Sequence, residues 1–209
     1  ETPSGSLFNV NFPTISVSPI NGAEGCAPAR SDLKMNVDLQ SDGGYEIFSG
    51  LKVNIDNPKE LGPDRIANSI GGYIKSESAV IVIDLGTATT FDLVNEKKEY
   101  LGGAIAPGIK ISLNALTSKT SSLKSVELET PRKVVGKNTY EAIQSGLIMG
   151  HSSMIDSMIE KIILESGLKP KIFVTGGLGK ILHPLLNIKS KYQEDLTLDG
   201  LEEIYKLNN

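Results

Sequence analysis

The most constraining feature of this chain is an aliphatic run that ends in an aspartate, a glycine and closely spaced threonines. Val80–Ile83 are four consecutive β-branched residues, typical of a strand covered on both faces. Gly86 allows a positive φ angle and lets a ligand approach the backbone. Thr87 and Thr89 offer hydroxyl and N–H groups to phosphate oxygens, and Asp84 can bind a cation that offsets phosphate charge. A plain hairpin with a polar turn is the alternative, but it needs fewer polar groups, so we favour a phosphate site.

The composition is that of an ordinary globular protein. The 209 residues can form one large or two small domains, and 39% of them are hydrophobic and 22% charged. A net charge of −4 argues against a nucleic-acid partner bound by a basic surface. Cys26 stands alone, so no internal disulfide is possible, and neither a signal-peptide pattern nor a long apolar window occurs. We therefore expect a cytoplasmic protein with no membrane partner.

The chain divides into an irregular N-terminal part and a regular remainder. Residues 1–44 are rich in Ser, Pro, Gly and Asn, with strand-like pieces such as Leu7–Phe12, and they suggest no chemistry. From Tyr45 onward, hydrophobic periodicity predicts strands and helices in an order that suggests a mixed sheet with helices on both faces. The predicted strands are 51–55, 80–83, 90–94, 100–108 and 171–174, and the predicted helices are 64–75, 109–119 and 139–165, with a short helix after 175–179.

Two further segments are candidates for a binding site. Asp64 begins a predicted helix, so it is either an N-terminal cap or a base that takes a proton from a substrate hydroxyl. Arg65 beside it can hold a carboxylate in two hydrogen bonds, which suits a small anionic substrate carrying an alcohol. Gly176 and Gly177 lie between a strand and a helix, where a phosphate or a flat ring can rest on the backbone.

The remaining polar and small residues have plainer interpretations. His151 lies in a predicted helix and His183 precedes a proline, and neither has a close metal-ligand partner, so we expect both to be structural. Gly146 and Gly150 lie on the long predicted helix at a spacing that lets another backbone pack closely. Ordinary helix packing and a subunit interface are both compatible with this pair.

Together these motifs resemble the type III pantothenate kinases. The resemblance runs from about Gly50 to the C-terminus, and its five motifs occur in the family's order. They are Asn57-Pro58 with Gly62-x-Asp64-Arg65, Asp84-Leu85-Gly86-Thr87-Ala88-Thr89-Thr90, Tyr100-Leu101-Gly102-Gly103-x-Ile105-x-Pro107-Gly108, Gly136-x-Asn138-Thr139 and Thr175-Gly176-Gly177, followed by Leu196-Thr197-Leu198-Asp199-Gly200-Leu201.

The resemblance implies an α/β fold of the acetate-kinase, sugar-kinase, Hsp70 and actin superfamily, with two ribonuclease-H-like halves and ATP between them. On that basis residues 1–44 are a divergent segment, 45–77 a remnant of the first half and 78–209 the second half. The implied activity is phosphorylation of pantothenate to 4'-phosphopantothenate, the first step of coenzyme A biosynthesis. The family uses Mg²⁺ with ATP and a monovalent cation, K⁺ or NH₄⁺, and works as a homodimer.

The resemblance also implies a role for each matching residue. Asp64 would be the general base, and Asp84 would bind the monovalent cation. The pantothenate pocket would be lined by Gly62, Pro63, Asp64 and Arg65, with Thr139 supplied by the neighbouring subunit. ATP would contact Gly86, Thr87, Thr89, Gly176 and Gly177.

Two departures from the family pattern keep other functions open. The Asp-x-Gly-Asn-Thr phosphate loop of the first half does not occur in residues 1–50, and Ile55 replaces a tyrosine that faces pantothenate in many members. The missing loop favours a non-catalytic relative that binds nucleotide or pantothenate. A different enzyme on the same fold, such as another small-alcohol kinase or a polyphosphate-splitting phosphatase, is a third hypothesis, against which Gly62–Arg65 and Thr139 argue.

Overall fold

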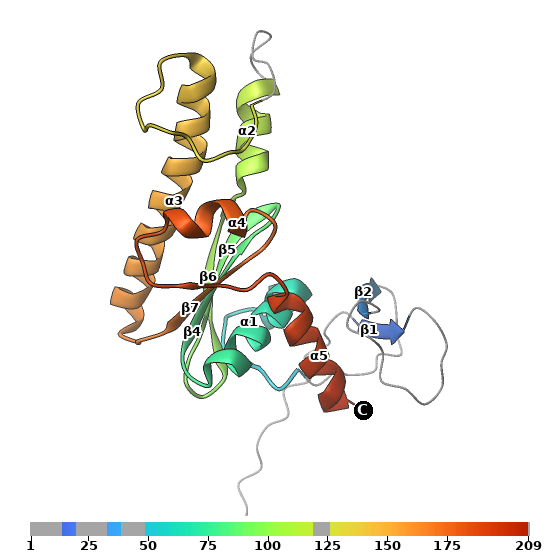
Figure 1. Cartoon of the computed structure of the whole chain (residues 1–209). Helices are drawn as coiled ribbons and strands as arrows, with labels where there is room; N and C mark the ends of the chain where they lie inside the picture. Colours follow the sequence, from blue (N-terminus) through green and yellow to red (C-terminus); the bar gives the residue numbers. More distant parts are fainter. Residues whose placement is uncertain (1–13, 20–32, 39–48, 119–125, 209) are drawn as a thin grey trace, which may run out of the picture.

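The computed structural model of the chain describes residues 14–19, 33–38, 49–118 and 126–208. Near the N-terminus, β1 (Thr14–Pro19) and β2 (Leu33–Asp38) form an antiparallel pair with Thr14 opposite Asp38. The strand-like piece Leu7–Phe12 lies outside the described residues. The rest of the described chain builds one larger α/β unit (Figure 1).

That unit is centred on a six-stranded mixed sheet with the order β3-β6-β5-β4-β7-β8. β4, β5 and β6 are antiparallel neighbours, whereas β7 runs parallel to β4 and β8 parallel to β7. A three-stranded meander followed by helical crossovers to parallel strands is the arrangement of a ribonuclease-H-like half, so the predicted fold class is confirmed. The strands are β3 (Lys52–Val53), β4 (Val80–Leu85), β5 (Ala88–Val94), β6 (Glu99–Pro107), β7 (Lys171–Thr175) and β8 (Lys191–Tyr192).

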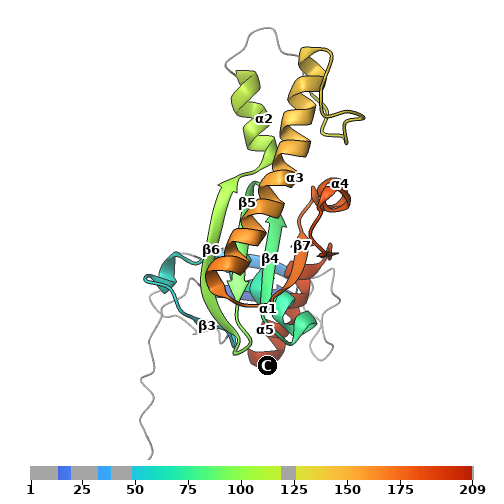
Figure 2. The same ribbon diagram turned by 90° about the vertical axis from the view of Figure 1, so that its left-hand side faces the viewer.

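Helices cover both faces of this sheet. α1 and α5 lie together on one face, and α3 crosses the other, as the two views in Figures 1 and 2 show. α2 and the first turns of α3 extend beyond the sheet as a separate tip. The α-helices are α1 (Pro63–Ser76), α2 (Ile109–Ser118), α3 (Thr139–Ser166), α4 (Gly179–Leu182) and α5 (Leu196–Asn208), with short 3₁₀ helices at Pro58–Glu60 and His183–Leu185.

The aliphatic run of β4 is buried on both sides, as its sequence predicts. Ile81 and Ile83 belong to a core that includes α3, whereas Val80 and Val82 belong to a second core with α1 and α5. All four side chains are fully buried, at 0% exposure. Alternate residues of a strand point to opposite faces, so a strand between two helical layers must be apolar throughout.

α1 and α5 approach each other at two glycines. A side chain at Gly71 would collide with the Leu196 carbonyl oxygen, and one at Gly200 would collide with the Ala67 carbonyl oxygen. These two close contacts fix α5 on α1. Because α1 shares its core with β4 and α5, residues of the segment 45–77 pack with residues of 78–209. The assignment of 45–77 to a separate half stays a prediction.

Most predicted elements occur within a few residues of their expected bounds. The strand expected at 51–55 is only Lys52–Val53, because just two residues pair with β6. β8 and α5 were not predicted as elements. None of the helices in the described ranges has both the length and the apolar character needed to cross a bilayer.

Candidate active site

The C-terminal end of β4 and the N-terminal end of α1 meet at Asp84. Its Oδ2 accepts a hydrogen bond of 2.8 Å from Asn68 Nδ2 on α1. Burial raises the pKa of Asp84 above its usual value, the Asn68 hydrogen bond opposes this shift, and the negative charge of Asp64 adds to it. The structure therefore brings the two predicted carboxylates, Asp64 and Asp84, to one place.

Asp64 is exposed in the first turn of α1 and does not cap the helix. The N-cap residue is Gly62, and Pro63 occupies the first helical position, where its missing N–H costs nothing. The Asp64 Oδ1 atom accepts 2.9 Å from the Arg65 backbone N–H. A Cβ atom at Gly62 would lie 2.6 Å from that same oxygen, so the glycine gives the carboxylate its room. Asp64 is therefore not the N-cap residue, although its carboxylate accepts from one N–H of the first turn.

The turn between β4 and β5 presents one of the two predicted phosphate-binding hydroxyls. Gly86 and Thr87 are exposed, and the Thr87 carbonyl oxygen accepts 3.1 Å from Gly108 N. Thr89 is 1% exposed, and its hydroxyl lies 2.8 Å from His151 Nε2 on α3. The structure thus turns the Thr89 side chain toward α3, away from the exposed turn that holds Thr87.

The glycine turn after β7 lies against Asp84. β4 and β7 are parallel neighbours in which Asp84 pairs with Thr175, so the turn that follows must adjoin the carboxylate. Gly176 has a φ of 90°, and a Cβ atom there would lie 2.5 Å from Asp84 Oδ1. Gly177 is exposed. At position 176 only glycine fits both the positive φ and the close approach to Asp84.

Arg65 is held by a buried polar cluster on β5 and β6 that is not apparent from the sequence. Its Nε donates 2.8 Å to Asp92 Oδ1, and its Nη2 donates 2.7 Å to the Tyr100 hydroxyl oxygen. The Asp92 carboxylate also accepts from Tyr100 at 2.8 Å and from Thr90 at 3.1 Å. The side chains of Arg65 and Asp92 are 15% and 0% exposed. The guanidinium is therefore fixed in place beside Asp64.

Burial dominates the electrostatics of this cluster. It raises the pKa of Asp92, an effect that the positive charge and hydrogen bonds of Arg65 oppose. Burial and the Asp92 charge together raise the pKa of Tyr100 far above its usual value, so the phenol keeps its proton and donates. The one available sequence signal was Asp92 itself, a charge between Phe91 and Leu93 in an apolar strand that requires a buried cation.

Thr139 does not join these residues within the chain. It begins α3 at the tip, far from the start of α1 (Figures 1 and 2). Asn138 caps the helix by accepting 2.9 Å from Glu141 N, and Glu141 Oε2 accepts 2.7 Å from Lys137 N. Asn138 is thus a side-chain N-cap, while Glu141 accepts from the residue before the cap rather than from the cap itself as in a capping box.

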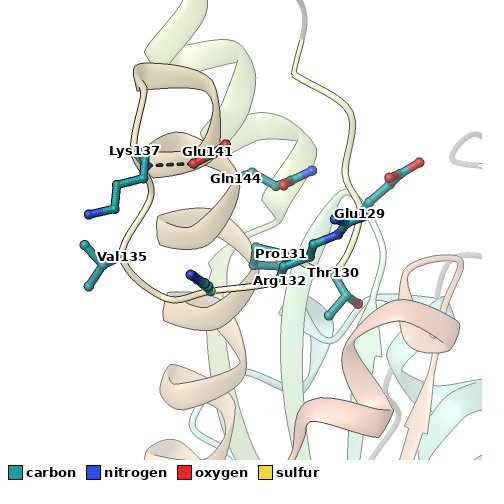
Figure 3. A pocket seen from close by; sticks show the side chains of 9 residues that line it. Glu129, Thr130, Pro131, Arg132, Val135, Lys137, Glu141 and Gln144 are labelled. Carbon is teal, nitrogen blue, oxygen red and sulfur yellow. Dashed lines mark hydrogen bonds between the residues drawn. The ribbon is translucent and has the colours of Figure 1, made fainter.

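The tip also contains a cavity of about 440 Å³ between α3 and the segment before it (Figure 3). That segment is fixed on α3 because Gln144 Nε2 donates 3.0 Å to the Glu127 carbonyl and Ser145 Oγ donates 2.6 Å to the Val134 carbonyl. None of the predicted site residues lines this cavity. Its walls are formed by Glu129, Thr130, Pro131, Arg132, Lys133, Val135, Lys137, Glu141 and Gln144.

The sheet order and the helices on both of its faces define a ribonuclease-H-like α/β protein. The family model described as type III pantothenate kinase matches residues 16–161. The match begins upstream of the motif resemblance, which starts near Gly50. The chain belongs to the type III pantothenate kinase family.

Two relatives illustrate the extent of the similarity. The type III pantothenate kinase of Persephonella marina is 47% identical over 162 residues, which are 78% of this chain and 64% of that protein. The type III pantothenate kinase of Geotalea daltonii is 43% identical over 165 residues, 79% of this chain and 64% of that protein. The chain therefore spans about 64% of the length of these relatives.

A solved structure supports the same fold. The crystal structure of a protein described as a Baf family transcriptional activator from Campylobacter jejuni superposes with a TM-score of 0.55 at 26% identity, covering 77% of this chain and 70% of that one.

Proposed function

We propose that this chain forms the core of a kinase that transfers a phosphoryl group from ATP to pantothenate. The product would be 4'-phosphopantothenate, made in the cytoplasm as the first step of coenzyme A biosynthesis. The observation that supports this most is the convergence of Asp64, Arg65 and Asp84 where the start of α1 meets the end of β4.

Each of these side chains suits one part of the reaction. The exposed Asp64 carboxylate would accept the proton of the pantothenate hydroxyl. The hydroxyl oxygen would bond to the γ-phosphorus of ATP while the bond from that phosphorus to the ADP oxygen breaks. Arg65, fixed by Asp92 and Tyr100, would orient the pantothenate carboxylate. Gly62 and Pro63 would line the pocket beside them.

The phosphate end of the site has oxygen ligands and open backbone, which suit ATP and a monovalent cation. When bound with Mg²⁺, ATP supplies the phosphoryl group. K⁺ or NH₄⁺ would neutralise part of the phosphate charge. Asp84 Oδ1 would hold the monovalent cation, and Thr87 would bind phosphate oxygens beside Gly86, Gly176 and Gly177. Mg²⁺ would be carried mainly by the phosphates of ATP.

We further propose that the site is shared between two copies of the chain. Thr139 of the partner subunit would close the pantothenate pocket that Asp64 and Arg65 open. A Cβ atom at Gly146 or at Gly150 would meet nothing within 4 Å, so this face of α3 has room for a second helix. Val134 and Val135 at the same tip are 69% and 72% exposed, and a partner would cover them.

The alternative is a non-catalytic relative that binds nucleotide or pantothenate without turnover. It is favoured by one observation, the lack of an Asp-x-Gly-Asn-Thr motif in residues 1–50. The two functions differ in whether bound ATP is consumed.

A coupled assay of ADP release, with and without pantothenate and in potassium and then sodium chloride, tests the proposal. We expect ADP release that requires pantothenate and is faster in potassium. ATP binding without pantothenate-dependent turnover would contradict the kinase and support the alternative.

A further inference from the structure

Asn68 is a buried polar residue of α1 that the proposed function leaves unused. Its side chain is 1% exposed and links two elements that are distant in sequence. The Nδ2 atom donates 2.8 Å to Asp84 Oδ2 on β4, and the Oδ1 atom accepts 2.6 Å from the Thr197 hydroxyl on α5.

The chemistry of the three groups fixes the direction of both hydrogen bonds. An ionised carboxylate only accepts, so Asn68 must turn its NH₂ group toward Asp84. Its carbonyl then faces Thr197, whose hydroxyl must donate. The two bonds run head to tail and polarise each other. Without the hydroxyl, the Asn68 carbonyl oxygen would be buried and unpaired, and a rotated amide would set that oxygen against the carboxylate.

This arrangement decides which oxygen of Asp84 faces the phosphate turns. Oδ2 is held on Asn68, which leaves Oδ1 on the side of the glycines. Cβ atoms at Gly176 and Gly86 would lie 2.5 Å and 3.5 Å from Oδ1. The Asn68 bond therefore sets the rotation of the carboxylate that the proposed function assigns to a cation.

Thr197 is itself held firmly against α1. The Gly200 and Gly71 contacts with the facing backbone leave no room for the helices to slide. Lys75 Nζ also forms an ion pair of 2.8 Å with Asp199 Oδ2 across the two helices. A hydroxyl on such a rigid helix can orient a group that contacts a bound ion.

We propose that Asn68 and Thr197 are positioning residues that hold Asp84 Oδ1 toward the phosphate turns, so that the C-terminal helix α5 sets the monovalent-cation affinity of the site. The proposal rests on the proposed function for the role of Asp84 as the cation ligand. Neither residue needs to touch pantothenate or ATP.

Three variants of the full chain separate this role from packing. Thr197→Val removes the hydroxyl at nearly constant shape, and Thr197→Ser restores a hydroxyl. Leu201→Ala, at a residue 3% exposed in the same helix, is the control that weakens the packing of α5 without touching the hydrogen bonds. Each variant is titrated with potassium chloride, at ionic strength held constant with choline chloride. The potassium response is the rise of the thermal midpoint with potassium concentration. Crystal structures of the two Thr197 variants show the rotation of Asp84.

We expect Thr197→Val to raise the half-saturating potassium concentration about tenfold, the lower end of the range for residues that orient metal ligands. Its Asp84 carboxylate should turn away from Gly176. Thr197→Ser should match the wild type in both respects, and Leu201→Ala should lower the midpoint but keep the potassium response.

An unchanged carboxylate and potassium response in Thr197→Val would overturn the proposal, as would a Thr197→Ser variant as impaired as the valine. A wild-type protein without any potassium response would overturn the role of α5 in cation affinity. Absence of pantothenate turnover together with a normal potassium response would instead count against the proposed function alone.

Discussion

The two ends of this molecule differ in how much of the site they complete by themselves. At the end of β4, Asp84 is held through Asn68 on α1 and Thr197 on α5, and Arg65 is held by hydrogen bonds to side chains of β5 and β6. At the tip, Thr139 is exposed at the start of α3, and α1 lies far from this end of α3 in Figures 1 and 2. On the proposed function, the end of β4 would be completed by Thr139 of a second copy.

The largest effect should come from the exposed carboxylate at the fixed end. Asp64→Asn removes the proposed base, and we expect pantothenate-dependent turnover to fall by about 10²–10⁴-fold. Because Gly62 is the N-cap residue and the amide oxygen of Asn can still accept from the Arg65 N–H, the thermal midpoint should stay close to that of the wild type. Turnover and thermal unfolding measured on one preparation check both parts. A variant with wild-type turnover would remove Asp64 from the mechanism.

The buried cluster under Arg65 should show how rigid the fixed end is. Asp92→Asn leaves the guanidinium without its counter-charge, and we expect the free energy of unfolding to fall by about 3–5 kcal/mol. The control is Glu202→Gln, which breaks the exposed Lys206–Glu202 pair of 2.6 Å on α5 and should cost under about 1 kcal/mol. Urea unfolding compares the two variants. Equal losses would mean that the cluster does not brace Arg65.

Substitutions on the open face of α3 test whether the tip forms a contact with a second copy. A Cβ atom at Gly146 or at Gly150 would meet nothing within 4 Å in a single chain, so leucines there should not lower its thermal midpoint. In a dimer they would overpack the contact and cost about 1–3 kcal/mol each. We expect light scattering to report monomers and turnover to fall with dimerisation, whereas the alanine pair should stay dimeric. A monomeric leucine variant with full turnover would disprove the shared site.

Much of the fixed end could be predicted because it depends on local sequence. The run Val80–Ile83 predicts a strand with two covered faces, and parallel pairing of β4 with β7 then brings Gly176 to Asp84. The direction of the Thr89 side chain could also be predicted from the sequence. It is two residues before Phe91, so period-two alternation puts it on the same α3 face.

What the sequence does not reveal are partners that only the tertiary fold brings together. Tyr100 and Arg65 are 35 positions apart, and Thr197 and Asn68 are 129 apart. No spacing rule links such pairs. β8 was missed because it has only two residues, too few for an alternation to be seen.

The smallest effect should be a pH dependence at the junction of β5 and α3. Burial lowers the pKa of His151 below its usual 6.5, so its contribution to stability is present above pH 6.5 and lost as pH falls through the folded-state pKa. His151→Gln cannot take up that proton. We expect the stability advantage of the wild type over the variant to shrink as the pH falls from 7.5 to 5.5. Thermal unfolding of both proteins, measured in steps of about half a pH unit, checks this. A gap that is constant with pH would mean that His151 keeps its usual pKa.

Mixing two inactive variants tests the shared site most directly. Asp64→Asn removes the base, and Thr139→Glu puts a negative charge where the anionic substrate would meet the partner, at a helix start that tolerates acidic residues. In a two-fold dimer with a shared site, each mixed dimer has one intact site, so equal mixing should restore about a quarter of wild-type turnover. Turnover that stays at the sum of the two separate variants, or full turnover by Thr139→Glu alone, would show that each chain builds its site without the partner.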